Sequence, residues 1–301
     1  MTAALPAEIG IVEVGPRDGL QNESALLSTA TKVELIERSI AAGARRVEAV
    51  SFAHPRLVPQ MADAEDVLAA APQRDDVEYS GLVLNRRGFD RALAAGVREV
   101  NVVVVATDEF SRRNQGVTTE EGLRVWEEIA AAAHAAGVRP VATIAVAFGC
   151  PFEGAVSSRH VIELARRIAD SGPFELALAD TIGAGVPTQV QELIGGIREI
   201  TDVSLRCHFH NTRNTGYANS VAAIRAGAAA LDASVGGIGG CPFAPNATGN
   251  IATEDLEYLL SGMGVDTGLD LAALSATGTW IGEQLGKEVP ALLGKAGPFP
   301  G

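Results

Sequence analysis

The chain of 301 residues is 47% hydrophobic and 20% charged, which is an ordinary globular composition with enough apolar residues for one large core. Its formal net charge of −13 argues against nucleic acid as a main partner, because phosphate backbones select basic surfaces. It has no run of ~18 apolar residues, so we expect no membrane span. Three scattered cysteines, Cys150, Cys207 and Cys241, predict no disulfide framework and a reducing, cytoplasmic setting.

A pattern of helical stretch, glycine and short apolar run recurs along the chain. Clear copies are AAGARRVEAVSF (41–52), AAGVREVNVVVV (94–105) and AAGVRPVATIAV (135–146), and looser copies cover 170–180 and 225–235. The glycine is typical of the left-handed residue that ends a helix. Nearly continuous apolar runs are typical of parallel strands that are buried on both faces.

These repeats predict about eight βα units in chain order. The expected strands lie near 9–14, 46–51, 78–83, 99–105, 140–146, 174–179, 203–209 and 230–235. The expected helices lie over 29–43, 118–137, 157–172, 187–200 and 214–227, and Thr118 and Glu121 fit a capping box.

We therefore predict one catalytic domain over 1–301, an α/β (β/α)8 TIM barrel at about 8–250 with additional C-terminal helices at about 251–290. The alternative is an open, doubly wound sheet, which predicts a GxGxxG turn after the first strand. The turn here reads GPRDG (15–19) and does not match.

Polar and ionisable side chains follow the predicted strands at their carboxyl ends, where a barrel carries its chemistry. They are Arg17 and Asp18 after the first strand, Glu48 and Ser51 on the second, Asp180 after the sixth, His208 and His210 at the seventh, and Asn246 and Asn250 beyond the eighth. Taken singly, each has a structural alternative, such as a turn cap, an ion pair or a core histidine. Their gathering at one end favours a site, because unpaired buried charges are costly.

Two histidines spaced two apart on a strand point to the same face, so His208 and His210 predict part of a metal site. Imidazole with carboxylate and amide oxygens suits a divalent ion such as Mg²⁺ or Mn²⁺, with Zn²⁺ or Co²⁺ as alternatives. Cys241 lies in a glycine-rich stretch that could close over a site, whereas Cys150 and Cys207 fit small buried positions.

Together these residues resemble those of 3-hydroxy-3-methylglutaryl-CoA (HMG-CoA) lyases, a family of metal-dependent aldolase-like barrels. The resemblance covers nearly the whole chain, from Ile11 to about Gly286. Its most specific motifs are VGPRDGLQNE (14–23), VEAVSF (47–52), VPQM (58–61), GCPFEG (149–154), LADTIG (178–183), HFHNT (208–212), SVGGIGGCPFAPNATGN (234–250) and ATEDL (252–256).

The resemblance implies cleavage of HMG-CoA to acetoacetate and acetyl-CoA with a divalent metal, Mg²⁺ or Mn²⁺. It implies that the metal ligands are Asp18, His208, His210 and Asn250. Arg17 would steady the thioester carbonyl as it becomes an enolate, and Cys241 would be the general acid. Supporting polar residues would be Gln21, Glu48 and Asp180, and the base for the C3 hydroxyl would be His208 or Asp18 ahead of Glu48.

Two positions depart from the family pattern: Asn211 stands where Asp is usual, and Ser24 where Lys is frequent. We expect Arg17, Gln21 and Asn211 to contribute to substrate binding, and the two changes make citramalyl-CoA a rival substrate. A non-catalytic barrel that only binds metal and ligand is disfavoured by the intact catalytic motifs.

The expected partner is an acyl-CoA. Candidate contacts for CoA anions are Arg86, Arg87, Arg112 and Arg113, although basic pairs are more often solvated surface residues. We also expect a homo-oligomer, with the C-terminal helices as the candidate interface.

Overall fold

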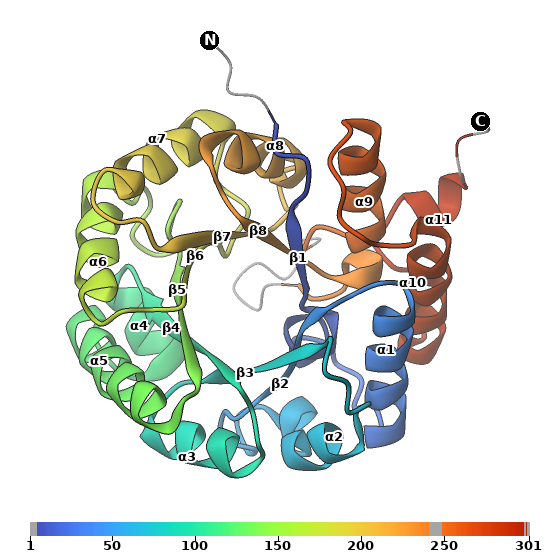
Figure 1. Cartoon of the computed structure of the whole chain (residues 1–301), viewed down its shortest axis with the longest axis horizontal. Helices are drawn as coiled ribbons and strands as arrows, with labels where there is room; N and C mark the ends of the chain where they lie inside the picture. Colours follow the sequence, from blue (N-terminus) through green and yellow to red (C-terminus); the bar gives the residue numbers. More distant parts are fainter. Residues whose placement is uncertain (1–4, 241–248, 298, 300–301) are drawn as a thin grey trace.

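The computed structural model describes residues 5–240, 249–297 and 299, and these form a closed barrel of eight parallel strands (Figure 1). Neighbouring strands pair in chain order, and β8 pairs with β1 to close the barrel. The strands are β1 Gly10–Glu13, β2 Arg46–Ser51, β3 Glu78–Val83, β4 Glu99–Val105, β5 Arg139–Ala145, β6 Glu175–Asp180, β7 Ser204–Phe209 and β8 Ala230–Ala233. The predicted (β/α)8 fold is therefore confirmed.

Helices surround the barrel, and the predicted ones begin and end close to their expected bounds. These are α1 Thr29–Ala41, α5 Thr119–Ala136, α6 Ser158–Asp170, α7 Pro187–Arg198, α8 Gly216–Ala226, α9 Thr253–Gly262 and α10 Leu271–Leu285. The capping box expected from Thr118 and Glu121 is present at the start of α5. Outside the predicted helical stretches lie α2 Ala64–Ala70, α3 Arg86–Ala94, α4 Asp108–Gln115 and α11 Leu293–Ala296. Among the described helices, none combines the length and apolar character needed to cross a bilayer.

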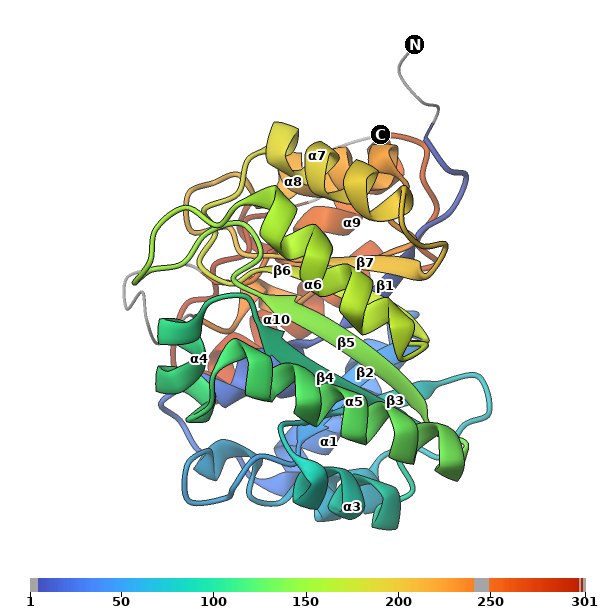
Figure 2. The same ribbon diagram turned by 90° about the vertical axis from the view of Figure 1, so that its left-hand side faces the viewer.

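The apolar core lies between the strands and the surrounding helices. Figure 2 shows α4, α5 and α6 running along the outside of the barrel, and Trp126 on α5 is fully buried on that side. The C-terminal helices α9, α10 and α11 gather beside β1 and α1 (Figure 1). They add a second layer next to the first strand, where the turn carrying Arg17 and Asp18 begins.

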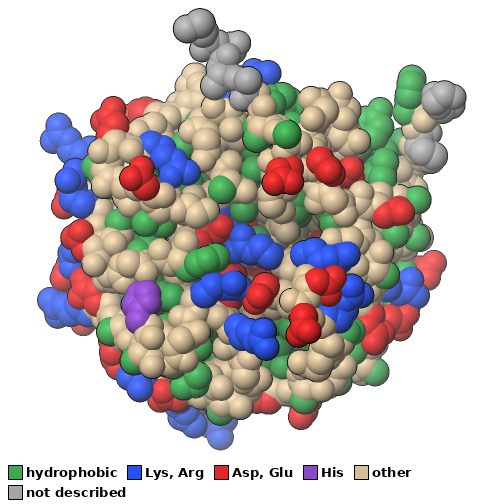
Figure 3. Space-filling model, viewed as in Figure 1, with side chains coloured by type: hydrophobic (Ala, Val, Ile, Leu, Met, Phe, Trp, Pro, Cys, Tyr) green, Lys and Arg blue, Asp and Glu red, His purple; other side chains and the backbone are tan. Residues whose placement is uncertain are grey.

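The interior of the barrel is unusually polar, because barrels are commonly filled by branched aliphatic side chains. Arg206 on β7 is only 1% exposed and lies 3.4 Å from Glu175 and 3.2 Å from Asp232. Arg46 and Glu175 lie at the amino-terminal ends of β2 and β6, and their side chains are 2.8 Å apart. Figure 3, viewed from that end, shows acidic and basic side chains gathered over its middle. Paired charges therefore close this end of the barrel.

Two buried carboxylates join the ends of β1 and β8 to the start of α9. Glu13 accepts hydrogen bonds from the backbone N–H groups of Gly15 at 2.7 Å and Val235 at 3.0 Å. Glu254 accepts from the N–H of Gly236 at 2.9 Å. Burial raises the pKa of Glu13 to about 7 and that of Glu254 to about 8. These contacts hold the turn after β1 against the segment after β8.

The raised pKa values predict that the free energy of unfolding falls as the pH rises from 6.5 to 8.5. Over this range the folded protein binds more protons than the unfolded chain, in which both carboxyl groups are already ionised. We expect a loss on the order of 1–3 kcal/mol, measured by urea denaturation. Glu254→Gln keeps an acceptor for Gly236 and should flatten the profile, whereas Glu283→Gln, at an exposed position on α10, should not. An unchanged slope in Glu254→Gln would contradict this assignment.

Candidate active site

The turn after β1 presents two charged residues at the carboxyl end of the barrel. It is a five-residue π-helical turn, Gly15–Gly19, a feature that often marks functional sites. A Cβ atom at Gly15 would lie 2.6 Å from the carboxylate of Glu13, so glycine is needed for the turn to approach β1 this closely. Pro16 has no N–H to satisfy in the first turn, and Arg17 and Asp18 follow it.

Arg17 is held between two carboxylates. Its guanidinium donates to Glu48 on β2 through a very short contact, and to Asp18 at 2.6 Å. Glu48 and Arg17 are both buried. Because each partner is fixed by the others, the guanidinium has one orientation before any ligand binds.

The two histidines of β7 converge on Asp18 as predicted. The ring centroids of His208 and His210 are 5.0 Å apart. One ligand atom from each of Asp18, His208 and His210 lies within 4.8 Å of the others. Asn250 completes the group, because its amide nitrogen donates to Asp18 at 2.8 Å and its backbone bridges to His210.

The electrostatics of the group favour ionised carboxylate and one neutral imidazole. Burial raises the pKa of Asp18, but Arg17 and the two histidines outweigh it and lower that pKa below its ordinary value. Burial and the neighbouring His208 lower the pKa of His210 to about 3. Burial also lowers the pKa of His208, but the hydrogen bond to Asp232 and the charge of Asp18 outweigh it and raise that pKa.

Asp232 on β8 orients His208. Its carboxylate lies 3.1 Å from His208 Nδ1, and its other oxygen lies 3.2 Å from Arg206 Nε. A carboxylate on Nδ1 favours the tautomer that carries the proton there, which leaves Nε2 as the free lone pair. That atom faces Asp18, with 3.9 Å between His208 Nε2 and Asp18 Oδ2.

This donor set fits a divalent metal ion. His210 Nδ1 is buried and has no hydrogen-bond partner among the described residues. A histidine with a purely structural role rarely leaves a buried ring nitrogen unsatisfied. A carboxylate and two imidazoles, one held by a carboxylate on its other nitrogen, are a common arrangement around Mn²⁺, Zn²⁺ and related ions. Asn250 offers an amide oxygen beside Asp18 as a further ligand.

The loop between β8 and α9 passes close to these ligands. Gly239 has a φ of 100°, and a Cβ atom there would lie 2.8 Å from the amide nitrogen of Asn250. Glycine at this position therefore lets the backbone cross directly over the ligand group. Cys241, the expected general acid, lies outside the described residues.

A cavity of about 220 Å³ opens above the ligand group. Arg17, Asp18, His208 and His210 line it, as does Gln21, whose Oε1 is buried without a hydrogen-bond partner among the described residues. A buried acceptor without a partner beside a cavity can accept a hydrogen bond from a ligand that reaches it. The position of Gln21 thus agrees with its predicted substrate-binding role, which stays a prediction.

Several predicted residues are held outside this cavity. Both oxygens of Asp180 accept backbone N–H groups, from Ala184 at 2.8 Å and Gly185 at 2.9 Å. Asn211 accepts from the N–H of Gly216 at 3.2 Å, at the start of α8. Both side chains thus shape loops, and neither is among the residues that line the cavity. Their catalytic and substrate-binding roles stay predictions.

Three of the four proposed CoA contacts lie in local ion pairs. Arg86 pairs with Asp90 at 2.8 Å, Arg112 with Asp108 at 2.8 Å and Arg113 with Glu109 at 2.7 Å. These pairs join neighbouring turns of the same helix and are well exposed, so each contributes little to the free energy of unfolding. An arginine in such a pair can leave its carboxylate to bind a phosphate.

Three polar residues of the site escaped the sequence analysis: Asn101 on β4, Thr143 on β5 and Asp232 on β8. All three line the cavity. The only signal is one polar residue within an apolar strand, in VNVVVV, VATIAV and ALDASV. Because side chains alternate between the two faces of a strand, the position of each residue along its strand indicates that it points into the barrel.

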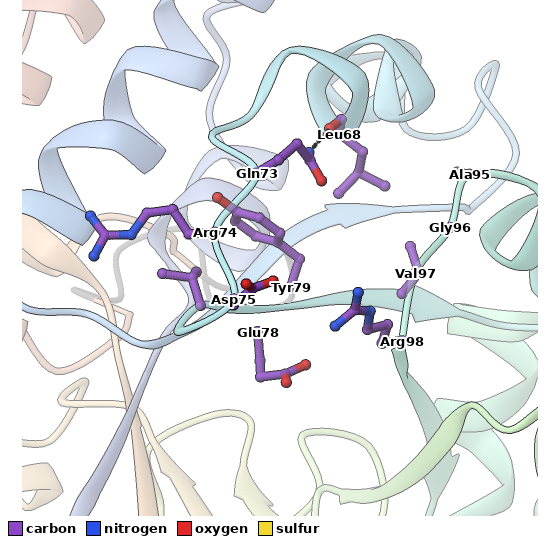
Figure 4. Close-up of a pocket in the computed structure, with 11 residues that line it drawn as sticks. Leu68, Gln73, Arg74, Asp75, Glu78, Tyr79, Ala95, Gly96, Val97 and Arg98 are labelled. Atoms are coloured by element: carbon purple, nitrogen blue, oxygen red, sulfur yellow. Dashed lines mark hydrogen bonds between the residues drawn. The ribbon is translucent and has the colours of Figure 1, made fainter.

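A second hollow, of about 300 Å³, lies at the opposite end of the barrel beside the first residues of β3 and β4 (Figure 4). Two of its charged residues are engaged with their surroundings: Arg74 pairs with Asp76 at 2.7 Å, and Glu78 with Arg139 at 2.7 Å. The hydroxyl of Tyr79 donates to the carbonyl of Pro72. Among the described residues that line this hollow, none is a histidine, so it lacks the grouping of carboxylate and imidazoles found around Asp18.

Comparisons with known proteins agree with this geometry. The HMGL-like family model matches residues 8–281. An (R)-citramalyl-CoA lyase of Chloroflexus aurantiacus is 48% identical over 96% of this chain and 95% of its own, and a hydroxymethylglutaryl-CoA lyase of Pseudomonas mevalonii is 44% identical over 92% and 93%. The structure of an HMG-CoA lyase from Acinetobacter baumannii, with coenzyme A and 3-methylmalate, superimposes with a TM-score of 0.92 at 37% identity, covering 98% of each chain. The resemblance predicted from the motifs is confirmed.

The contact between Asp232 and His208 predicts a loss of metal affinity in Asp232→Asn. An amide can donate to Nδ1 and so favour the tautomer with a proton on Nε2, which cannot bind a metal. We expect Mn²⁺ to bind about 10–100-fold more weakly, measured by isothermal titration calorimetry. The matched control is Glu175→Gln, which disturbs Arg206 from its other side but does not touch His208. Equal Mn²⁺ affinities in Asp232→Asn and the unmodified protein would refute the orienting role.

Proposed function

We propose that this chain, which belongs to the HMGL-like family of carbon–carbon lyases, cleaves citramalyl-CoA to pyruvate and acetyl-CoA. One observation carries the reaction type: a fixed guanidinium, Arg17, lies beside the Asp18–His208–His210 group in a single cavity. The choice of acyl group rests on the charges that line that cavity.

Retro-aldol cleavage of a 3-hydroxyacyl-CoA between C2 and C3 makes three demands. The C3 hydroxyl must lose its proton, the departing acetyl-CoA carbanion must be held as an enolate, and that carbon must then be protonated. A divalent ion such as Mg²⁺ or Mn²⁺, held by Asp18, His208, His210 and Asn250, would lower the cost of ionising the hydroxyl. The protein's own residues supply the rest.

Arg17 is suited to hold the enolate. Its orientation is set by Glu48 and Asp18, so no reorganisation is needed as negative charge develops on the thioester oxygen. Glu48 is less suited to act as the base, because one oxygen binds Arg17 and the other accepts a hydrogen bond from Asn101. Both oxygens of Asp18 are likewise engaged, by Arg17 and Asn250, which leaves His208 as the favoured candidate for taking the hydroxyl proton.

The charges of the cavity favour citramalyl-CoA. Among the described residues that line it, Arg17 is the only lysine or arginine, and it is already paired with two carboxylates. In citramalyl-CoA the carboxylate is attached to the carbon that bears the hydroxyl, so both groups can reach one ion. In HMG-CoA the carboxylate is one methylene further away and would need a partner of its own.

Two relatives add support for this acyl group. The Chloroflexus protein named (R)-citramalyl-CoA lyase is 48% identical to this chain. The Acinetobacter HMG-CoA lyase was solved with 3-methylmalate, a five-carbon isomer of citramalate. HMG-CoA is the second candidate, because hydroxymethylglutaryl-CoA lyases are 38–44% identical over most of the chain.

The test is a steady-state comparison of the two thioesters with Mg²⁺ or Mn²⁺, with EDTA as control. We expect kcat/KM for citramalyl-CoA to exceed that for HMG-CoA by about 10-fold or more, the effect of one misplaced charged group or methylene. A preference for HMG-CoA would reject the proposed substrate while keeping the lyase reaction. Cleavage that resists EDTA would reject the role of the metal.

Cys241 is proposed as the acid that protonates the enolate carbon. Cys241→Ala should lower kcat about 10²–10⁴-fold, as for the loss of a general acid, and leave Mn²⁺ affinity unchanged. The control is Cys150→Ala, because Cys150 is buried near the same end of the barrel but does not line the cavity. Near-normal turnover in Cys241→Ala would show that another group supplies the proton.

The assembly and location of the protein stay proposals. Apolar side chains are exposed on α9 and just before α11, with Tyr258 at 44% and Leu292 at 66%, which suits the expected homo-oligomer. The cytoplasmic setting rests on the scattered cysteines, of which Cys150 and Cys207 are free thiols.

A further inference from the structure

Asn101 joins the catalytic arginine to the wall of the barrel. It lies on β4, a strand that contributes none of the predicted catalytic residues, and it is 3% exposed. Its amide nitrogen donates to Glu48 Oε2 at 2.7 Å, and its amide oxygen accepts from the hydroxyl of Thr143 at 2.7 Å. The other oxygen of Glu48 binds Arg17.

The direction of these hydrogen bonds is fixed by chemistry. An ionised carboxylate can only accept, so the amide of Asn101 must present its nitrogen to Glu48. Its oxygen then faces Thr143, which must donate. The reversed amide would place two acceptors against each other at 2.7 Å. Thr143, Asn101, Glu48 and Arg17 therefore form a single chain that runs across β5, β4 and β2 to the turn after β1.

We propose that Asn101 is a positioning residue for the reaction, with Thr143 locking its amide. Without Asn101, the second oxygen of Glu48 would be buried with no donor, and the carboxylate could rotate away from Arg17. The guanidinium would then lose the contact that aims it. This inference rests on the proposed function, in which Arg17 holds the enolate.

Asn101 acts on turnover more than on binding. An interaction that strengthens only as the enolate forms affects kcat, whereas an interaction made equally with bound substrate affects KM. A purely structural role for Asn101 predicts something different, namely lower stability with normal turnover of the folded protein. The two roles can therefore be separated by measurement.

The decisive variants are Asn101→Leu, which removes both hydrogen bonds at similar volume, and Asn101→Asp. We expect Asn101→Leu to lower kcat about 10–100-fold with KM changed less than about threefold. Asn101→Asp should recover activity relative to the unmodified protein as the pH falls from 8 to 6. A protonated carboxyl can donate to Glu48 as the amide does, whereas an ionised one repels it.

Variants at Thr143 and Val102 complete the design. Thr143→Val should lower kcat and Thr143→Ser should restore it, because serine keeps the hydroxyl that donates to Asn101. Val102→Ala is the stability control, because Val102 is the next residue of β4 and packs in the apolar core. It should lower the melting temperature without changing kcat. A kcat for Asn101→Leu within twofold of the unmodified protein would overturn the proposal.

A crystal structure of Asn101→Leu tests the same point without an assay. We expect the Glu48 carboxylate to rotate and the Arg17 guanidinium to leave its place beside it. An unmoved pair would overturn the positioning role even if turnover falls. If the unmodified protein cleaves no acyl-CoA, the proposed function fails, and this structural comparison still decides whether Asn101 positions Arg17.

Discussion

The structure of the site depends on one partly buried carboxylate, Asp18, which lies among Arg17, His208 and Asn250. These residues come from the first strand, the seventh strand and the segment after the eighth, so only closure of the barrel brings them together. A charge that is largely withdrawn from solvent is costly unless it is paired. The side chains around Asp18 are accordingly ones that can pair with a carboxylate: a guanidinium on one side, imidazoles on the other and an amide between them. The same arrangement places a candidate metal site beside a fixed cation.

The need to pair buried charges also shapes the interior of the barrel beneath the site. His208 is oriented by Asp232, which is paired with Arg206, and Arg206 lies beside Glu175. Arg17 is aimed by Glu48, which is held by Asn101 and Thr143. Each hydrogen bond contributes only about 1 kcal/mol to stability, but each broken one would leave a buried charge unsatisfied. Rigidity of the reacting groups thus comes from paired charges within the barrel, whereas stability comes from the apolar layer outside it.

Much of this could be predicted from the sequence. The fold followed from repeated glycines after helices and from apolar runs of strand length, because both signals are local. The ligand group followed from His208 and His210, whose spacing places them on one face. Asn101, Thr143 and Asp232 were missed, because a single polar residue in an apolar strand shows no partner in sequence. The contacts of Asp180 and Asn211 with loop N–H groups depend on how those loops turn, which spacing does not reveal.

We propose that this constellation breaks a carbon–carbon bond by way of an acetyl-CoA enolate. The most direct measurement is product analysis by NMR and mass spectrometry after turnover of citramalyl-CoA in D₂O with Mg²⁺. Retro-aldol cleavage predicts pyruvate together with acetyl-CoA that carries one deuterium in its methyl group, because the enolate carbon takes a proton that has exchanged with solvent. Formation of free coenzyme A and citramalate would instead show hydrolysis of the thioester and would contradict the account.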